Sequence, residues 1–150
     1  MPDVARAKHV LGQAIEDVAR EARVLDAAVE AIDTEAKRRA LRAPGQTAVR
    51  RFYRTQIEAA KAIQRDWAPR GSDPEIERET PAQAELDLNT RIRPALIDLG
   101  DRIARLVVSA GGDSPPTRGE VTRALDRHAL AGDDVDAIHT SLVGLLTPVR

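Results

Sequence analysis

Four charged residues near the N-terminus have the types and spacing that chemistry on a ligand would need: Lys8, Asp17, Arg20 and Glu21. The last three stand at positions i, i+3 and i+4 of a predicted helix, so they share one of its faces. Asp17 and Glu21 each adjoin an apolar position, which predicts that they lie at the edge of the apolar face. On spacing alone, a solvated ladder of surface charges explains them better than a site does, because such pairs are common and weak.

Gln64 is a second polar residue at the margin of an apolar helix face. It follows Ala60 by one turn and Gln56 by two. An amide at a buried edge needs hydrogen-bond partners. Before any other information, a hydrogen bond between helices is the simplest explanation for it.

Sequence signatures of several common enzyme classes do not occur in this chain. There is no P-loop, no dinucleotide-binding fingerprint and no G-x-S-x-G elbow. The chain has no cysteine, and His9, His128 and His139 lack the spacing of a helical metal pair. Any catalysis is therefore expected to proceed without a metal, a cofactor or a covalent nucleophile.

The composition predicts a helical core built from small and aliphatic residues. Of the 150 residues, 42% are hydrophobic but only 2% are aromatic, and such a core suits closely packed helices better than sheets. Lys and Arg total 23 against 24 Asp and Glu, a formal net charge of -1, which argues against a nucleic-acid partner. No apolar run approaches the roughly 20 residues of a membrane span, so no membrane partner is expected.

Apolar periodicity and turn signals predict an all-α protein, with one helical domain of about six helices over residues 1–150. Breaks are expected at residues 12–13, 43–45 and 111–116, with a surface loop at residues 70–74. The basic run at residues 37–42 falls where a long helix should end, and cations there complement the helix dipole. The predicted helices cover residues 3–11, 15–41, 47–67, 88–108, 117–130 and 133–146.

The same periodicity predicts which side chains face the core. Pro94 falls inside the helix 88–108 and predicts a kink or a later start there. Thr117 and Glu120 form a predicted capping box. The residues expected to face inward are Val18, Ala22, Leu25, Val29 and Ile32 in the helix 15–41, Tyr53, Ile57, Ala60, Ile63 and Trp67 in the helix 47–67, and Leu88, Ile92, Leu99, Ile103 and Leu106 in the helix 88–108.

Two segments together resemble a known family. Residues 8–21, KHVLGQAIEDVARE, closely resemble the lysine-to-glutamate signature of the all-helical, AroQ-type chorismate mutases. Residues 49–64, VRRFYRTQIEAAKAIQ, look like the other active-site helix of that family, and the helices after Pro116 resemble its exported subclass. The resemblance implies a chorismate mutase type II-like fold, with active-site helices in residues 1–110 and a C-terminal helical extension in residues 117–147.

The implied activity is the conversion of chorismate to prephenate in aromatic amino acid biosynthesis, an intramolecular Claisen rearrangement without a cofactor. Negative charge grows on the ether oxygen as its C–O bond breaks, so a site must hold the reactive conformer and stabilise that oxygen. By resemblance, Lys8 and Gln64 are the catalytic residues that donate hydrogen bonds to this oxygen from two sides, and Lys8 also contacts a carboxylate.

The resemblance also implies the residues that bind the rest of the substrate. Arg20 would bind a carboxylate through its planar guanidinium group. Glu21 would accept a hydrogen bond from the ring hydroxyl, and Asp17 would line the same wall. Ala60 stands where relatives often carry a hydroxyl residue that touches a carboxylate, so one hydrogen bond would be lost.

Two arginines of the family pattern are harder to match. Arg102 matches the arginine that the exported subclass supplies from a later helix, with Arg93 or Arg105 as alternatives. Another carboxylate-binding arginine, on the first helix of the family, would fall just upstream of Met1, because Arg6 is too close to Lys8. We therefore expect either a native start further upstream or an incomplete site.

The subclass resembled implies a homodimer in the periplasm or outside the cell, although the chain as given carries no leader sequence. Two alternatives stay open. One is another pericyclic enzyme on the same scaffold, such as an isochorismate pyruvate-lyase, and the other is a non-catalytic helical binding module. The unmatched first-helix arginine favours the module, whereas Lys8, Arg20, Glu21 and Gln64 favour the mutase.

Overall fold

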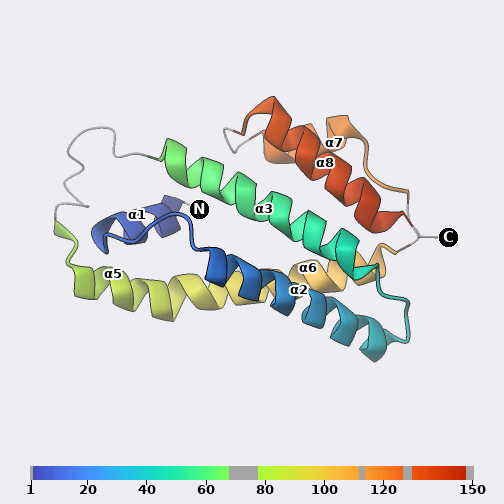
Figure 1. Ribbon diagram of the computed structural model, residues 1–150, viewed down its shortest axis with the longest axis horizontal. Helices are drawn as coiled ribbons and strands as arrows, with labels where there is room; N and C mark the ends of the chain where they lie inside the picture. Colours follow the sequence, from blue (N-terminus) through green and yellow to red (C-terminus); the bar gives the residue numbers. More distant parts are fainter. Residues whose placement is uncertain (1, 68–77, 112–113, 127–129, 148–150) are drawn as a thin grey trace.

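The computed structural model describes residues 2–67, 78–111, 114–126 and 130–147, and within these ranges it contains helices and no strand. α5, the π-helical turn η1 and α6 follow one another without a break, so six helical rods make up the described part (Figure 1). The prediction of an all-α protein is confirmed, while the loop predicted at residues 70–74 lies outside the described residues. The elements are α1 (Pro2–Val10), α2 (Val18–Arg39), α3 (Gln46–Asp66), α5 (Pro81–Asp87), η1 (Leu88–Ile92), α6 (Arg93–Ser109), α7 (Arg118–Leu125) and α8 (Gly132–Leu146).

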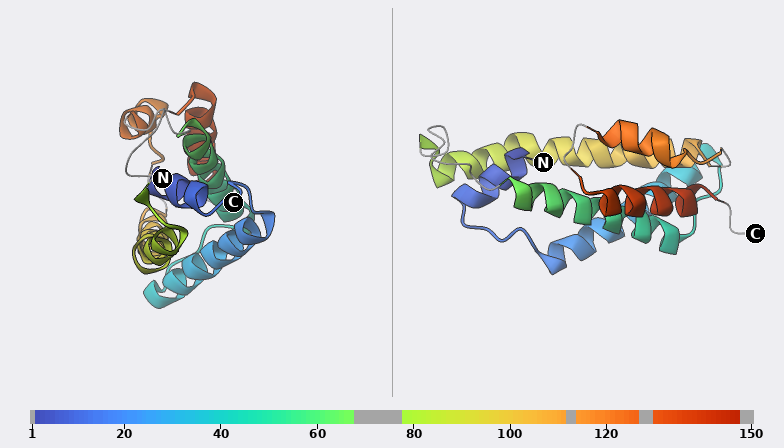
Figure 2. Two further views of the ribbon diagram at one scale, coloured as in Figure 1. Left: turned by 90° about the vertical axis from the view of Figure 1, so that its left-hand side faces the viewer. Right: turned by 90° about the horizontal axis from the view of Figure 1, so that it is seen from above.

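The helix α3 lies between two groups of helices (Figures 1 and 2). It packs against α2 on one side and against α8 on the other, and α2 in turn packs against α6. The short helix α1 packs against the C-terminal part of α3. It also packs against α5 and η1, which form the first part of the continuous rod α5–η1–α6. The start of α2, the end of α3 and the whole of α1 therefore meet at one end of the molecule.

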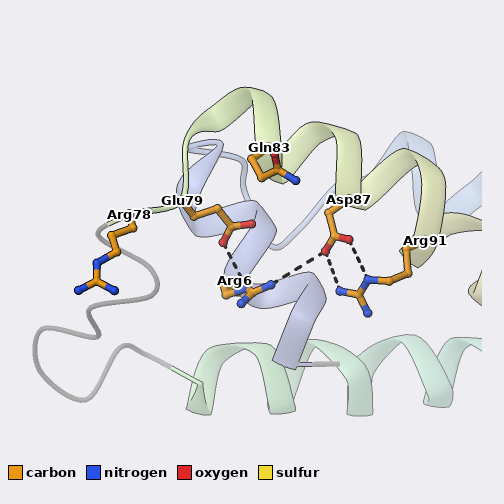
Figure 3. Close-up of a pocket in the computed structure, with 6 residues that line it drawn as sticks. All are labelled: Arg6, Arg78, Glu79, Gln83, Asp87 and Arg91. Atoms are coloured by element: carbon orange, nitrogen blue, oxygen red, sulfur yellow. Dashed lines mark hydrogen bonds and ion pairs between the residues drawn. The ribbon is translucent and has the colours of Figure 1, made fainter.

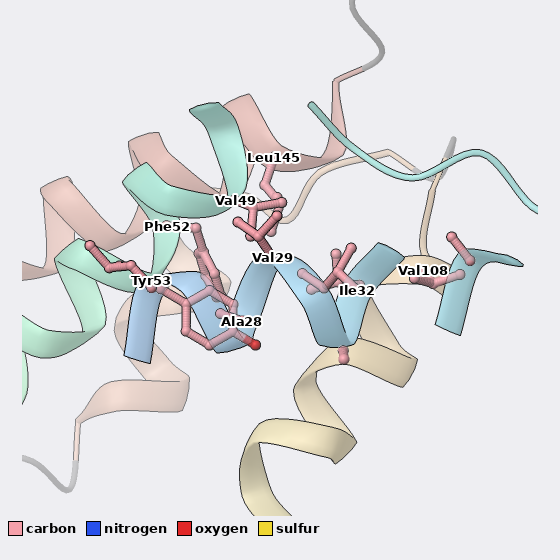
Figure 4. Close-up of a cluster of buried hydrophobic side chains, with 12 residues drawn as sticks. Ala28, Val29, Ile32, Val49, Phe52, Tyr53, Val108 and Leu145 are labelled. Carbon is pink, nitrogen blue, oxygen red and sulfur yellow. The ribbon is translucent and has the colours of Figure 1, made fainter. Parts of the chain in front are cut away.

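The main core lies where α2, α3, α6 and α8 meet (Figure 4). Its side chains are mostly aliphatic or alanine, as the composition predicts, with one edge-to-face aromatic pair between Phe52 and Tyr53. Because these side chains are small, the long helices approach one another closely and pack directly together. The buried residues are Leu25, Ala28, Val29, Ile32 and Ala36 of α2, Val49, Phe52 and Tyr53 of α3, Ala104, Val107 and Val108 of α6, and Leu145 of α8.

The helix α2 begins at Val18, later than the predicted residue 15. Asp17 is its N-cap, and the Asp17 carboxylate accepts a hydrogen bond from the backbone N–H of Arg20, which satisfies a donor that the helix start leaves open. The prediction that Val18 and Ala22 face the core is wrong, since Val18 is 74% exposed and Ala22 is also exposed. The apolar stripe of α2 begins at Leu25.

The π turn η1 shifts the inward face of α6 by one position. A π turn adds one residue to the helical spacing. The apolar stripe that begins with Leu88 and Ile92 therefore continues on α6 one residue later than an unbroken α-helix would place it. The prediction that Leu99 and Leu106 face the core is wrong, because they are 44% and 68% exposed. At Pro94, where a kink or a later start is predicted, the α-helix α6 begins at Arg93, directly after the π turn. Proline offers no backbone N–H and is well tolerated in the first turn of a helix. The buried residues of α6 are instead Ala104, Val107 and Val108.

Other local predictions agree with the structure more closely. The bounds of α1, α3 and α8 differ from the predicted ones by one residue at most. Thr117 and Glu120 form the capping box, in which each residue's side chain accepts a hydrogen bond from the backbone N–H of the other. The helix α7 ends at Leu125, short of the predicted residue 130.

The basic run at the end of α2 also has a specific partner. Lys37, Arg38 and Arg39 occupy the last turn, as predicted, and the two arginines bind the buried carboxylate of Glu35. The hydrogen bond from Arg38 lowers the pKa of Glu35 from 4.5 to about 2, Arg39 adds to this effect, and burial opposes it. The charged form of Glu35 therefore stabilises the folded state.

Replacing Glu35 by glutamine is expected to remove a pH-dependent part of the stability. Because the pKa of Glu35 is lower in the folded state, its contribution is present above pH 4.5 and is lost as the pH falls through about 2. Urea unfolding of the wild type and Glu35→Gln should give a difference in free energy that shrinks between these two values. Glu30→Gln, on the exposed face of α2, is the control. A Glu35→Gln difference that stays constant from pH 6 to pH 2 would contradict this origin.

Candidate functional site

Lys8 lies near the C-terminal end of α1 with a half-buried side chain. Its ammonium donates a hydrogen bond to the carbonyl oxygen of Ile15, at 2.7 Å, in the loop between α1 and α2. An ammonium carries three N–H donors, and within the described residues Lys8 makes no ion pair. Donors of Lys8 are therefore available to a ligand.

Charged groups of α2 and α3 surround Lys8. Burial lowers the pKa of Lys8, and the positive charges of Arg20 and, more weakly, Lys61 act in the same direction. The negative charges of Asp17 and Glu21 raise it. The four residues that the sequence singles out near the N-terminus thus come together in space, although Asp17 also caps the helix.

Lys61 of α3 is the residue of this cluster that the sequence analysis missed. Its side chain is 5% exposed, and its ammonium lies 2.7 Å from Glu58, 3.3 Å from Glu21 and 3.3 Å from Glu16. The hydrogen bond with Glu58 is the main reason that the pKa of Lys61 is raised, and burial opposes it. Its spacing in the sequence could have revealed it, because a lysine four residues after Ile57 falls on the apolar face of α3, where a charged side chain needs partners.

The C-terminal part of α3 carries the other predicted site residues. Gln64 is buried and lies one turn after Lys61, and Ala60 is half-buried. At the end of this helix the ring of Trp67 meets that of His9 of α1 edge to face, with ring centroids 6.3 Å apart. The contact holds α1 against α3 beside the cluster.

An open recess of about 560 Å³ adjoins the start of α2. Three arginines line it: Arg20 and Arg23 of α2 and Arg93 of α6. Among the described residues none of these guanidinium groups forms an ion pair, although the Asp17 carboxylate also lines the recess. Guanidinium groups without an ion-pair partner around one open space are suited to bind an anion such as a carboxylate or a phosphate. The remaining lining residues are Gln13, Val24 and Ala27.

A second recess, of about 460 Å³, lies between α1 and α5 and has a different character (Figure 3). Arg6 lies 3.3 Å from Glu79 and 4.0 Å from Asp87, and Asp87 also binds Arg91 at 2.6 Å. Arg6 and Arg91, two of the three arginines that line this recess, are already paired with carboxylates of the protein, so an anion bound there would have to displace those carboxylates. The network joins α1 to α5 and is less suited to binding than the first recess.

The three arginines considered for carboxylate binding in the helix 88–108 occupy different positions. Arg93 lines the recess that Arg20 also lines, whereas Arg102 and Arg105 are exposed on α6 and line neither recess. Lys8, Asp17, Arg20 and Glu21 are thus brought together, with Ala60 and Gln64 on the neighbouring helix, and Arg102 is not brought to this group.

The described residues contain neither a cluster suited to a metal ion nor a helix suited to cross a membrane. No group of three or more histidine, cysteine or acidic side chains there has a geometry that could hold a metal ion. No helix in the same part of the chain combines the length and the apolar character that a membrane crossing requires. His128, which the sequence analysis considered, lies outside the described ranges, and His139 contacts the carbonyl of Pro116.

Comparison with known proteins adds no identification. No family model matches the chain, and a search of curated proteins finds no match.

Proposed function

We propose that this chain is a chorismate mutase, which rearranges chorismate to prephenate without a cofactor. The observation that carries the proposal is the position of Lys8, an ammonium with unused donors, in the same charged cluster as Arg20, which also lines an arginine-rich recess. Cations with no ion-pair partner within the described residues suit a substrate that carries two carboxylates and develops negative charge on an ether oxygen.

In the proposed reaction one C–O bond of the ether breaks and one C–C bond forms within the same molecule, so no proton or co-reactant is needed. Arg20 and Arg93 would bind carboxylates and hold the flexible substrate in its reactive conformer. Lys8 and Gln64 would donate hydrogen bonds to the ether oxygen as its charge grows. Glu21 would accept a hydrogen bond from the ring hydroxyl.

Arg93, and not Arg102, is the later-helix arginine that we assign to substrate binding, because it shares the recess with Arg20. Arg93→Ala is expected to lower kcat/KM about 10–100-fold, chiefly through KM, as the loss of a hydrogen bond to a charged group implies. Arg102→Ala is the matched control on the same helix and should stay within about twofold of wild type. The reverse order of the two losses would contradict the assignment.

The test of the function is direct. The purified full-length native protein is supplied with chorismate, and both the loss of chorismate and the formation of prephenate are measured. A parallel assay with isochorismate, scored by the release of pyruvate, separates the mutase from a pyruvate-lyase on the same scaffold. Absence of turnover of chorismate would overturn the proposal, and binding of chorismate without turnover would indicate a non-catalytic module.

A further inference from the structure

Lys61 joins three separate parts of the chain through one buried ammonium. Its partners are Glu58 on α3, Glu21 in the first turn of α2, and Glu16 in the loop that precedes α2. The loop is the same one whose Ile15 carbonyl receives the hydrogen bond from Lys8. A change at Lys61 would therefore act on the start of α2 and on the segment beside Lys8.

The ammonium of Lys61 has no donor left for a substrate. It carries three N–H groups, and three carboxylates surround it at distances of 2.7 to 3.3 Å. Lys8 differs, because its only hydrogen bond within the described residues is the one to Ile15. Lys61 is therefore suited to orient acidic groups and not to bind the reacting molecule.

Among the three carboxylates, Glu21 depends most on Lys61. The side chain of Glu21 is 25% exposed, against 52% for Glu58 and 66% for Glu16. An ion pair is stronger where less water surrounds it. Removing the ammonium would leave the partly buried Glu21 carboxylate without its ion-pair partner, whereas the two more exposed carboxylates can be solvated.

We propose that Lys61 is a positioning residue, which holds the carboxylate of Glu21 at the wall of the site and ties the loop before α2 to α3. The inference rests on the proposed function, in which Glu21 accepts a hydrogen bond from the ring hydroxyl. The groups that face Glu21 in this arrangement are Lys61 of α3 and Lys8 of α1, with Asp17 and Arg20 of its own segment nearby.

Three single variants test whether Lys61 acts on catalysis. Lys61→Met keeps most of the length of the side chain without its charge. It is expected to lower kcat/KM for chorismate about 10–100-fold, the range for losing hydrogen bonds to a charged group. Lys61→Arg, which keeps the charge, should recover part of this loss. Glu58→Gln removes the shortest ion pair of Lys61 but leaves Glu21 in place, and should stay within about twofold of wild type.

A double-mutant cycle then separates positioning from a general effect on the fold. In a Glu21→Gln background, Lys61→Met is expected to cause little further loss of kcat/KM, because the group through which it acts is already gone. An equal loss in both backgrounds would overturn the proposed role. If Lys61→Met does not fold, Lys61→Gln, which also removes the charge, is measured in the same two backgrounds under the same criterion. No turnover by the wild type would overturn the proposed function itself, so the two failures are distinguishable.

Discussion

Replacing Lys8 by alanine is expected to lower kcat for the rearrangement of chorismate by about 10²–10³-fold, the cost of removing one preorganised donor from a developing oxyanion. The reason is electrostatic, since the ammonium of Lys8 is half-buried, has unused donors and lies in one charged cluster with Arg20. The fold should change little, because the only hydrogen bond lost within the described residues is the one to Ile15. Such a bond contributes about 1 kcal/mol to stability.

The measurement combines steady-state kinetics with urea unfolding on the same samples. Lys37→Ala is the matched control, because Lys37 is exposed in the last turn of α2, away from the site. It should leave kcat unchanged. A Lys8→Ala protein that folds and retains kcat within about threefold of wild type would show that Lys8 does not stabilise the transition state.

Replacing Gln64 by glutamate is expected to confine the activity to acidic solution. An amide donates a hydrogen bond at any pH, whereas a carboxyl donates only while it is protonated. Gln64 is buried, and burial favours the neutral form of a carboxyl group, while the ammonium groups of this cluster favour the charged form. Activity of Gln64→Glu should therefore be almost absent at pH 8 and rise steeply as the pH falls below about 5, near the ordinary pKa of glutamic acid.

The pH profile of kcat/KM from pH 4 to pH 9 measures this effect. Gln56→Glu, the same substitution two turns earlier on α3, is the control and should keep the wild-type profile. A Gln64→Glu enzyme that is fully active at pH 8 would show that Gln64 donates no hydrogen bond to the ether oxygen. Far-UV circular dichroism across the same range separates a titration of the site from acid unfolding.

The sequence by itself determined the features that depend on neighbours along the chain. Periodicity and turn residues predicted the helices, and the Thr117–Glu120 box was recognisable because its hydrogen bonds join residues three apart. The grouping of Asp17, Arg20 and Glu21 followed for the same reason, although Asp17 is the N-cap of α2 and not a helical residue. Its hydrogen bond from the backbone N–H of Arg20 keeps it beside the first turn, which holds Arg20 and Glu21.

Only the tertiary structure decided which residues meet across helices. Lys61 appeared in the sequence as one lysine in an amphipathic helix, and only the approach of α2 and its preceding loop made it a buried partner of Glu21 and Glu16. Which of the candidate arginines lines the recess with Arg20 likewise depended on how α6 packs beside the start of α2. Pro94 predicted a kink or a later helix start near this point, but not the π turn η1, whose extra residue rotates the faces of α6 that follow it. Contacts between distant segments depend on how whole helices pack, which local spacing does not specify.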